Sequence, residues 1–278
     1  MAEEEAKRKL WVATANVGGH DFDREREAQI IFEQISAPII AMQEIKPEFQ
    51  PVLQKPGYAF VQGLMTSDHG FRVPIQYDTR VCNLIDEHAG HLTGNRKPGK
   101  SFDDGAERTY TLAAFGIPGA RVVVGNAHFG FAPQSIRESM KILAAEMLRF
   151  AEKHDTPYML MLGDFNMNVM FHPLGNSTEQ ARNNRAASRE AYEHAEQLGF
   201  KDAFMIAKPN GFSKPRGRVR TFNNWSSGEP YALDEGVTVD SDYVFVQRFD
   251  ASVANVASVE VGGVMAFDHF PSVVQLRY

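Results

Sequence analysis

The sequence predicts an α/β fold built from two similar halves, because one pattern of helix, proline, buried strand and carboxylate occurs twice in the chain. In the first copy, the apolar positions between Asp23 and Ile35 have helical spacing. Pro38 closes the turn that follows, and the apolar run Ile39 to Met42 has the length of a buried strand. This strand brings Glu44 to the edge of the predicted sheet.

The second copy begins near Ser135 with an apolar face at helical spacing. The residues of this face are Ile136, Met140, Leu143, Ala144, Met147, Leu148 and Ala151. Pro157 ends the segment, the run Tyr158 to Leu162 predicts a buried strand, and Asp164 follows it. Two such units predict two α/β halves related by a pseudo-two-fold axis.

Further apolar runs predict the remaining strands, and polar stretches predict the loops. We expect strands at residues 10–17, 58–64, 81–85, 108–115, 122–125 and 272–276, and a helix over 186–198. Loops are expected at residues 89–105, 168–184 and 208–225. No linker-like change of composition divides the chain, so we expect one domain over residues 10–278 after a charged tail at residues 1–9.

The bulk composition narrows the class of protein. Of the 278 residues, 43% are hydrophobic and 23% are charged, as in ordinary soluble globular proteins. A net charge of −6 means that any contact with nucleic acid has to be local. Cys82 is the single cysteine, which excludes an intrachain disulfide and favours a small buried residue. The charged start lacks an apolar signal segment, and no apolar run reaches the length of a membrane span, so we expect a cytoplasmic protein.

Six short polar motifs stand at the ends of apolar runs, and together they carry the chemistry of a phosphodiesterase. A divalent cation binds hard carboxylates and keeps open positions for phosphate oxygens. The attacking water needs a carboxylate or imidazole base, and charge developing at phosphorus needs fixed donors such as Asn and His. Metal-assisted hydrolysis of a phosphodiester by in-line attack of an activated water is therefore the predicted reaction. In chain order the motifs are Ala15-Asn16-Val17, Gln43-Glu44, Asn126-Ala127-His128, Gly163-Asp164-Phe165-Asn166, Ser241-Asp242-Tyr243 and Asp268-His269.

In this order, the motifs resemble the endonuclease/exonuclease/phosphatase superfamily, whose members include pancreatic-type deoxyribonucleases, abasic-site endonucleases, sphingomyelinases and phosphoinositide phosphatases. The resemblance extends from Trp11 to Leu276. Its strongest pieces are Gly163-Asp164-Phe165-Asn166, Phe267-Asp268-His269-Phe270-Pro271 and Ala41-Met42-Gln43-Glu44. The resemblance implies a four-layer sandwich of two packed mixed β-sheets flanked by helices, with a pseudo-two-fold axis.

The resemblance and the residue types together suggest the metal site. Glu44 is the first choice for a Mg²⁺ ligand, with Mn²⁺ as the alternative metal, because Mg²⁺ uses one or two carboxylates and keeps several waters. Asn16 and Asp268 complete the expected metal site. Asn16 and Asn166 are neutral amides that are expected to orient the metal-bound water or the phosphate.

Four further residues are expected to handle protons and charge. Either Asp164 or His269 takes the proton of the attacking water, and the sequence favours neither. Asp242 is expected to pair with His269 and to favour its imidazolium form. His128 is expected to donate a hydrogen bond to a phosphoryl oxygen.

Substrate contacts are expected from one strand end and one basic loop. In deoxyribonuclease-like members an Arg at the place of Arg108 contacts phosphate, whereas other members use a Tyr, so Tyr110 is the competing candidate. Trp225 is expected either to stack on a base or to anchor the loop at residues 208–225. A run of basic residues in this loop could follow a phosphate backbone. These basic residues are Lys214, Arg216, Arg218 and Arg220.

Nucleic acid, DNA or RNA, is therefore the favoured substrate, and a nuclease or nucleic-acid-end phosphodiesterase the favoured function. Abasic-site endonucleases carry Tyr-x-Pro-Asn where this chain has Asn126-Ala127-His128-Phe129, and the Trp-Thr-Asp-Arg signature of phosphoinositide 5-phosphatases does not occur. Phe267 stands in place of the serine that usually precedes Asp-His, which adds bulk beside the site. The alternatives are a phospholipid, sphingomyelin or phosphoinositide phosphoesterase and a catalytically silent binding module of the same fold.

Overall fold

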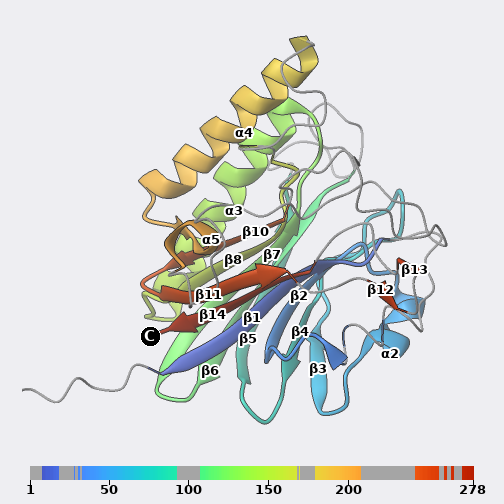
Figure 1. Cartoon of the computed structure of the whole chain (residues 1–278), viewed down its shortest axis with the longest axis vertical. Helices are drawn as coiled ribbons and strands as arrows, with labels where there is room; N and C mark the ends of the chain where they lie inside the picture. The colour runs from blue at the N-terminus through green and yellow to red at the C-terminus, as the bar shows by residue number, and fades with distance from the viewer. Residues whose placement is uncertain are drawn as a thin grey trace, which may run out of the picture.

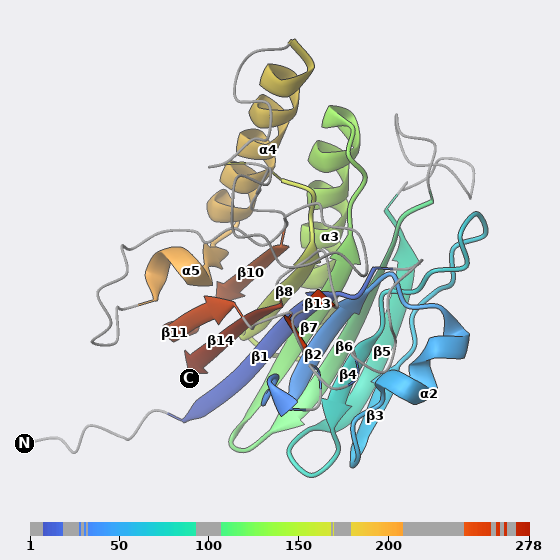
Figure 2. The same cartoon turned by 45° about the vertical axis from the view of Figure 1, so that its right-hand side comes forward.

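The computed structural model describes residues 8–18, 28, 31, 33–92, 107–167, 169, 179–207, 242–256, 260–261, 264–265 and 271–278. Within these residues, two six-stranded mixed β-sheets form an α/β sandwich with flanking helices (Figures 1 and 2), as the sequence predicts. The first sheet has the spatial order β11 (Asp250–Val256), β14 (Ser272–Arg277), β1 (Lys9–Asn16), β2 (Ile39–Gln43), β4 (Ile75–Asp78) and β3 (Tyr58–Val61). The second has the order β5 (Asn83–His91), β6 (Thr109–Ile117), β7 (Ala120–His128), β8 (Met159–Asp164), β10 (Asp242–Gln247) and β9 (Lys201–Asp202). A separate pair consists of β12 (Glu260–Val261) and β13 (Val264–Met265).

The two sheets repeat one order of strand directions. In the first sheet β1 and β2 are parallel, and antiparallel strands β14 and β4 flank them. In the second sheet β7 and β8 are parallel, and antiparallel strands β6 and β10 flank them. The outermost strands of both sheets are also antiparallel to their neighbours. This correspondence is the predicted pseudo-two-fold relation, and it gives each half one central parallel pair.

Helices cover the sandwich. The long helices α3 (Pro133–Lys153) and α4 (Glu179–Gln197) lie side by side against the second sheet (Figure 1). Arg137 of α3 donates two hydrogen bonds to the carboxylate of Glu190 of α4, at 2.5 and 3.2 Å. The short elements are η1 (Pro47–Phe49), α2 (Gln50–Leu53) and α5 (Ala203–Ile206). Among the helices that the structure describes, none combines the length and the apolar character needed to cross a membrane.

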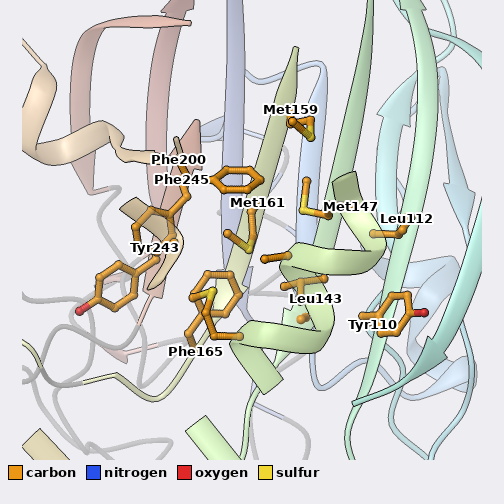
Figure 3. Close-up of a cluster of buried hydrophobic side chains, with 14 of the residues drawn as sticks. Tyr110, Leu112, Leu143, Met147, Met159, Met161, Phe165, Phe200, Tyr243 and Phe245 are labelled. Carbon is orange, nitrogen blue, oxygen red and sulfur yellow. The ribbon is translucent and has the colours of Figure 1, made fainter. Parts of the chain in front are cut away.

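Alternate side chains of each central strand enter different cores, because the side-chain period of a strand is two residues. In β8, Leu160 and Leu162 pack between the two sheets. Met159 and Met161 point the other way and pack beneath α3 and α4 (Figure 3). Methionine and aromatic side chains contribute much of this second core, so its methionines have a packing role.

A third core lies on the outer face of the first sheet. Ile40 and Met42 of β2 pack there with Ala28, Ile31 and Ile35. Ala28 and Ile31 are helical, and the other positions of the helix predicted between residues 23 and 35 lie largely outside the described residues. Three cores separated by two sheets require four layers, which agrees with the predicted sandwich.

Several predicted boundaries need correction. The strand expected at residues 81–85 is β5, which begins at Asn83 and continues to His91, inside the segment expected to be a loop. β4 is missing from the predicted strands because its buried Gln76 interrupts the apolar run. α4 begins at Glu179 rather than at residue 186, because its first turns are polar and show no apolar face. β5 is the outermost strand of its sheet, where apolar periodicity is weak.

Cys82 has the expected structural role. Its side chain is buried, and burial together with the nearby charge of Asp78 raises the pKa of the thiol to about 12. A thiol with this pKa remains protonated near neutral pH and is a poor nucleophile.

A buried network of amides joins the two sheets at their centre. Nε2 of Gln43 donates to Oδ1 of Asn126 at 2.7 Å and to the hydroxyl of Thr14 at 3.1 Å. Nδ2 of Asn126 in turn donates to the carbonyl oxygens of Met42 and Pro74 at 2.7 and 2.8 Å. Gln43, Asn126 and Thr14 are completely buried. Because the polar atoms of this network are paired, it fixes the two sheets relative to each other without a desolvation penalty.

We predict that Asn126→Leu lowers the free energy of unfolding by about 2–5 kcal/mol, because the amide of Gln43 and two carbonyl oxygens each lose a buried hydrogen bond. Urea unfolding of both proteins measures this change. Asn83→Ala is the matched control, because Asn83 is an exposed residue of the same sheet; its effect should stay within about 0.5 kcal/mol. Equal effects of the two substitutions would contradict the role of the network.

Candidate functional site

The candidate site lies where the two central parallel pairs end. β1 and β2 end at Asn16 and Gln43, and β7 and β8 end at His128 and Asp164. Val12, Val124 and Leu162 belong to the core between the sheets, so residues two or four positions later point into the same space. This alternation places Asn16, His128 and Asp164 directly above the buried amide network. The carboxyl ends of parallel strands are the usual place for a site in an α/β sheet.

The amide of Asn16 connects the two halves of the site. Nδ2 donates to Oε1 of Glu44 at 3.2 Å and to Oδ2 of Asp164 at 3.0 Å. Oδ1 accepts a hydrogen bond from the backbone N–H of Gly18 at 3.1 Å, which fixes the orientation of the amide. Two carboxylates from different sheets therefore meet at one NH₂ group.

Glu44 reaches this position through an unusual backbone conformation. It directly follows Gln43, so regular strand geometry would turn its side chain to the opposite face of the sheet. Its φ is +60°, a left-handed value that a glutamate seldom adopts. The reversal turns the carboxylate back toward Asn16. Backbone strain of this kind is concentrated at functional positions.

His128 lies between the same two carboxylates. Its Nδ1 is 3.8 Å from Oε1 of Glu44, and its Nε2 is 3.6 Å from Oδ2 of Asp164. A guanidinium nitrogen of Arg108 lies 3.4 Å from Nδ1. Since a guanidinium can only donate, this contact assigns the acceptor role to Nδ1 and the proton to Nε2 of the neutral ring. Nε2–H then points toward Asp164.

Arg108 brings a positive charge to the site without a carboxylate partner among the described residues. Its Nε–H is buried and donates no hydrogen bond in that part of the chain. Its contacts there are the ring nitrogen of His128 and the ring of Phe131, whose centroid is 5.5 Å from the guanidinium carbon. A planar cation with unused donors is suited to bind a phosphate oxygen.

The segment after β8 is held by a tight turn. Gly163 has a φ of +151°, and a Cβ at this position would lie 2.0 Å from the carbonyl oxygen of Ala127. Asn166 has a φ of +48°, its backbone N–H donates to Oδ1 of Asp164 at 3.0 Å, and its Nδ2 donates to the carbonyl of Phe129 at 2.8 Å. Asn166 thus fixes the carboxylate of Asp164. Only glycine fits the close approach of β8 to β7 that precedes this carboxylate.

Asp242 lies beside Asp164 on the neighbouring strand. The two residues are directly opposite each other in the antiparallel pair of β10 and β8, and both are buried. Residues directly opposite on one face of a sheet are close enough to interact. The pairing expected between Asp242 and His269 involves a residue outside the described part of the chain and stays a prediction.

A small hollow of about 20 Å³ adjoins Glu44 and His128 on the side of Arg108. One wall is the segment between β3 and β4, which the buried carboxylate of Glu107 holds in place. Glu107 accepts hydrogen bonds from the backbone N–H and hydroxyl of Ser67 at 2.5 and 2.7 Å and lies 3.0 Å from the ring of His91. The residues lining the hollow are Glu44, Thr66, His69, Phe71, Arg72, Val73, Glu107, Arg108, Thr109 and His128.

Asp68 fastens the same wall. Burial opposes its charged form, but the backbone N–H groups of Glu107 and His69 donate to its carboxylate at 2.8 Å each. These hydrogen bonds outweigh burial, and the pKa of Asp68 lies below its ordinary value. The wall of the hollow is therefore fixed by two carboxylates, that of Asp68 in the loop and that of Glu107 just before β6.

Tyr110, the competitor of Arg108 for the substrate, occupies a different environment. It is buried in the core beneath α3 (Figure 3), and its hydroxyl lies 3.3 Å from Nε2 of His88. Burial raises the pKa of this hydroxyl to about 12. Of the two candidates, Arg108 is the residue that contacts His128.

The structure brings together most of the predicted residues that it describes, namely Asn16, Glu44, Arg108, His128, Asp164, Asn166 and Asp242. Asp268, His269, Lys214, Arg216, Arg218, Arg220 and Trp225 lie outside the described residues. The sequence analysis missed Glu107 and Phe131. Phe131 carried a signal, because it is an aromatic residue three positions after His128 that the predicted helix does not bury. Glu107 carried none, because nothing in the pattern marks an isolated buried glutamate.

The donor set fits a small hard cation. Glu44 and Asp164 offer two carboxylates that share the amide of Asn16, and a divalent cation would relieve the repulsion between them. Among the described residues, no group of three or more His, Cys, Asp or Glu side chains is placed to hold a metal ion. One or two carboxylates, with waters or phosphate oxygens in the other positions, are what Mg²⁺ normally uses.

Comparison with known proteins finds one matching family model. The family model described as "Endonuclease/Exonuclease/phosphatase family" matches residues 13–272. No curated protein sequence matches significantly.

Solved structures match over nearly the whole chain. A mannosyl-6-phosphatase from Bacteroides thetaiotaomicron is 18% identical with a TM-score of 0.71, over 97% of this chain and 100% of that chain. A functionally unknown conserved protein from Enterococcus faecalis is 19% identical with a TM-score of 0.72, over 96% and 99%. TDP2 from D. rerio, complexed with a single-strand DNA product, is 14% identical with a TM-score of 0.67, over 97% and 99%. At these identities the structural likeness establishes the fold.

Proposed function

Since this chain belongs to the endonuclease/exonuclease/phosphatase family, we propose that it is a Mg²⁺-dependent phosphodiester hydrolase that acts on nucleic acid, as a nuclease or a nucleic-acid-end phosphodiesterase. The observation that carries this proposal is the meeting of Glu44 and Asp164 at the amide of Asn16. Beside these carboxylates lie the imidazole of His128 and the guanidinium of Arg108, which has no ion-pair partner among the described residues. Together these groups could bind a cation and a phosphate. The domain is then residues 10–278 as one unit, because both sheets supply site residues.

Glu44 would hold the cation with the predicted ligand Asp268. Asn16, the other predicted ligand, would coordinate only through Oδ1, which in this structure accepts the N–H of Gly18. The bound cation supplies charge neutralisation at the phosphoryl oxygens. Mn²⁺ is the alternative ion. Asn166 keeps the carboxylate of Asp164 in one orientation through its backbone N–H.

The proton and charge steps fall to the other residues. Asp164 or His269 takes the proton of the attacking water, and the proposal holds for either. Nε2–H of His128, which faces Asp164, would donate to a non-bridging phosphoryl oxygen bound beside that carboxylate, and Arg108 would donate to the phosphate from the other side of the imidazole. Fixed donors aimed at developing charge provide the larger part of the rate enhancement in such sites.

The nucleic-acid substrate is supported by charge and by similarity. Arg108 is a cation without a carboxylate partner among the described residues. The run from Lys214 to Arg220 adds four positive charges to a chain that is acidic overall. TDP2, which shares the fold, is complexed with a single-strand DNA product. A cytoplasmic location is also part of the proposal.

A sugar phosphate is the second candidate substrate, because a mannosyl-6-phosphatase shares the fold at a similar TM-score. A substrate panel separates the candidates. It contains plasmid DNA, single-stranded RNA, abasic duplex, tyrosyl-DNA, phospholipid and mannose 6-phosphate, each with Mg²⁺ and with a chelator. Chelator-sensitive cleavage of a nucleic acid supports the proposal. Cleavage of the sugar phosphate or lipid alone replaces it, and no cleavage at all points to a silent binding module.

We predict that Glu44→Gln raises the Mg²⁺ concentration for half-maximal rate by at least about 10-fold, because a neutral amide is a poorer ligand for a hard cation. Titration of the metal against the cleavage rate measures this midpoint. Glu48→Gln is the control, since Glu48 is an exposed glutamate four residues later. An unchanged midpoint in Glu44→Gln would remove Glu44 from the metal site.

We predict that Arg108→Ala lowers kcat/KM by about 10²–10³-fold, the usual loss for one positioned charge-stabilising donor. Arg108→Lys should recover part of the rate, because the ammonium keeps the charge but not the planar fork of donors. Steady-state kinetics measure both variants against Arg121→Ala, which removes an exposed arginine at the other end of the sandwich. If Arg108→Ala and Arg121→Ala behave alike, Arg108 does not contact the substrate.

A further inference from the structure

Phe131 exposes a large aromatic ring beside the candidate site. It follows His128 by three residues, in the segment that joins β7 to α3. The residue is 60% exposed, the largest fraction among the exposed large hydrophobic side chains of the described chain. Phe129, two residues earlier, is fully buried, so the local sequence places one ring in the core and one at the surface.

The ring of Phe131 is coupled to the phosphate-binding groups through Arg108. The guanidinium carbon lies 5.5 Å from the centroid of the ring, within the range of a cation–π contact. The same guanidinium lies 3.4 Å from Nδ1 of His128. Arg108 is therefore shared between the imidazole of the site and an exposed aromatic ring. If Arg108 binds the phosphate of a substrate, a group esterified to that phosphate would lie close to Phe131.

Arg108 also lines the hollow, where a second pair of planar groups lies. The rings of His69 and Phe71 stack there with centroids 5.7 Å apart and an interplanar angle of 29°. The ammonium of Lys46 is 5.9 Å from the centroid of Phe71. This side of the site therefore presents both aromatic rings and cationic side chains. Such a surface is suited to bind planar groups with delocalised electrons, whereas an acyl chain needs a continuous apolar groove.

We propose that Phe131 is a specificity-determining residue, a stacking platform for a nucleobase attached to the scissile phosphate, while Arg108 and His128 hold the phosphate itself. The inference rests on the proposed function and narrows it to substrates with a base next to the reacting bond. Every nucleobase has a π-face, so stacking on Phe131 would be tolerant of sequence. A phenylalanine ring has two side-chain torsions, and its contact with Arg108 further restricts it, so little freedom is lost on binding.

Kinetics with matched substrates test the platform. One substrate is the dinucleotide thymidylyl-thymidine. The other is its base-free analogue, in which a tetrahydrofuran ring replaces each nucleoside. Phe131→Leu should lower kcat/KM for the dinucleotide by roughly 5- to 100-fold, the range for loss of one base–aromatic stack. It should leave the base-free analogue unchanged. Phe131→Tyr should keep the parent rate on both, and Val81→Ala, at the opposite end of the sheets, controls for loss of exposed apolar surface. Equal losses on both substrates, or no loss on either, overturn the proposal.

Binding tests the same inference without catalysis. Isothermal titration compares thymidine 5′-monophosphate with deoxyribose 5-phosphate on the parent and on both Phe131 variants. Tighter binding of the nucleotide by the parent and by Phe131→Tyr, lost in Phe131→Leu, supports the platform even if the parent cleaves no diester and the proposed function fails. Equal affinity of the parent for the two ligands overturns the platform even if Mg²⁺-dependent cleavage is observed. Melting temperatures of the variants confirm that each is folded.

Discussion

The hydrogen bond from Gln43 to Asn126 is the interaction on which the site depends. It joins the central strands of two sheets that the chain builds separately, and it lies one side-chain layer below the functional groups. Apolar packing between the sheets is non-directional, so it would tolerate a small shift of one sheet relative to the other. Amides that are completely buried have to keep their partners, so they fix one alignment. That alignment brings Asn16 of one sheet within hydrogen-bond distance of Asp164 of the other.

Above this network, the site brings charged side chains of both signs close together. Glu44 and Asp164 share one amide, and His128 lies between them. Arg108 adds a cation that forms no ion pair within the described residues. A cation near the carboxylates and an anion near the guanidinium would complement both features at once. The proposed reaction would use both features, with Glu44 holding the cation and with Arg108 and His128 as fixed donors to the phosphate.

Much of this arrangement follows from the sequence, and the exceptions have physical causes. The two-residue period of β7 and β8 places Asn126, His128 and Asp164 on one face, so the strand-end motifs predict a shared site. The same period fails for Glu44, whose positive φ reverses its side chain and leaves no trace in the local pattern. It also fails for Arg108, which precedes the first residue of β6, while Tyr110 follows the strand geometry into the core. Edge strand β5 was shortened in the prediction because its exposed residues are polar.

The central claim is that groups from the two sheets act as one catalytic unit. A double-mutant cycle of Glu44→Gln and Asp164→Asn, measured as kcat/KM for Mg²⁺-dependent cleavage of a phosphodiester, tests it most directly. The account predicts strong non-additivity: the double variant should lose little more than the more damaging single variant, because either substitution already disables the unit. Losses that multiply across the cycle would show that the two carboxylates act independently and would contradict the claim.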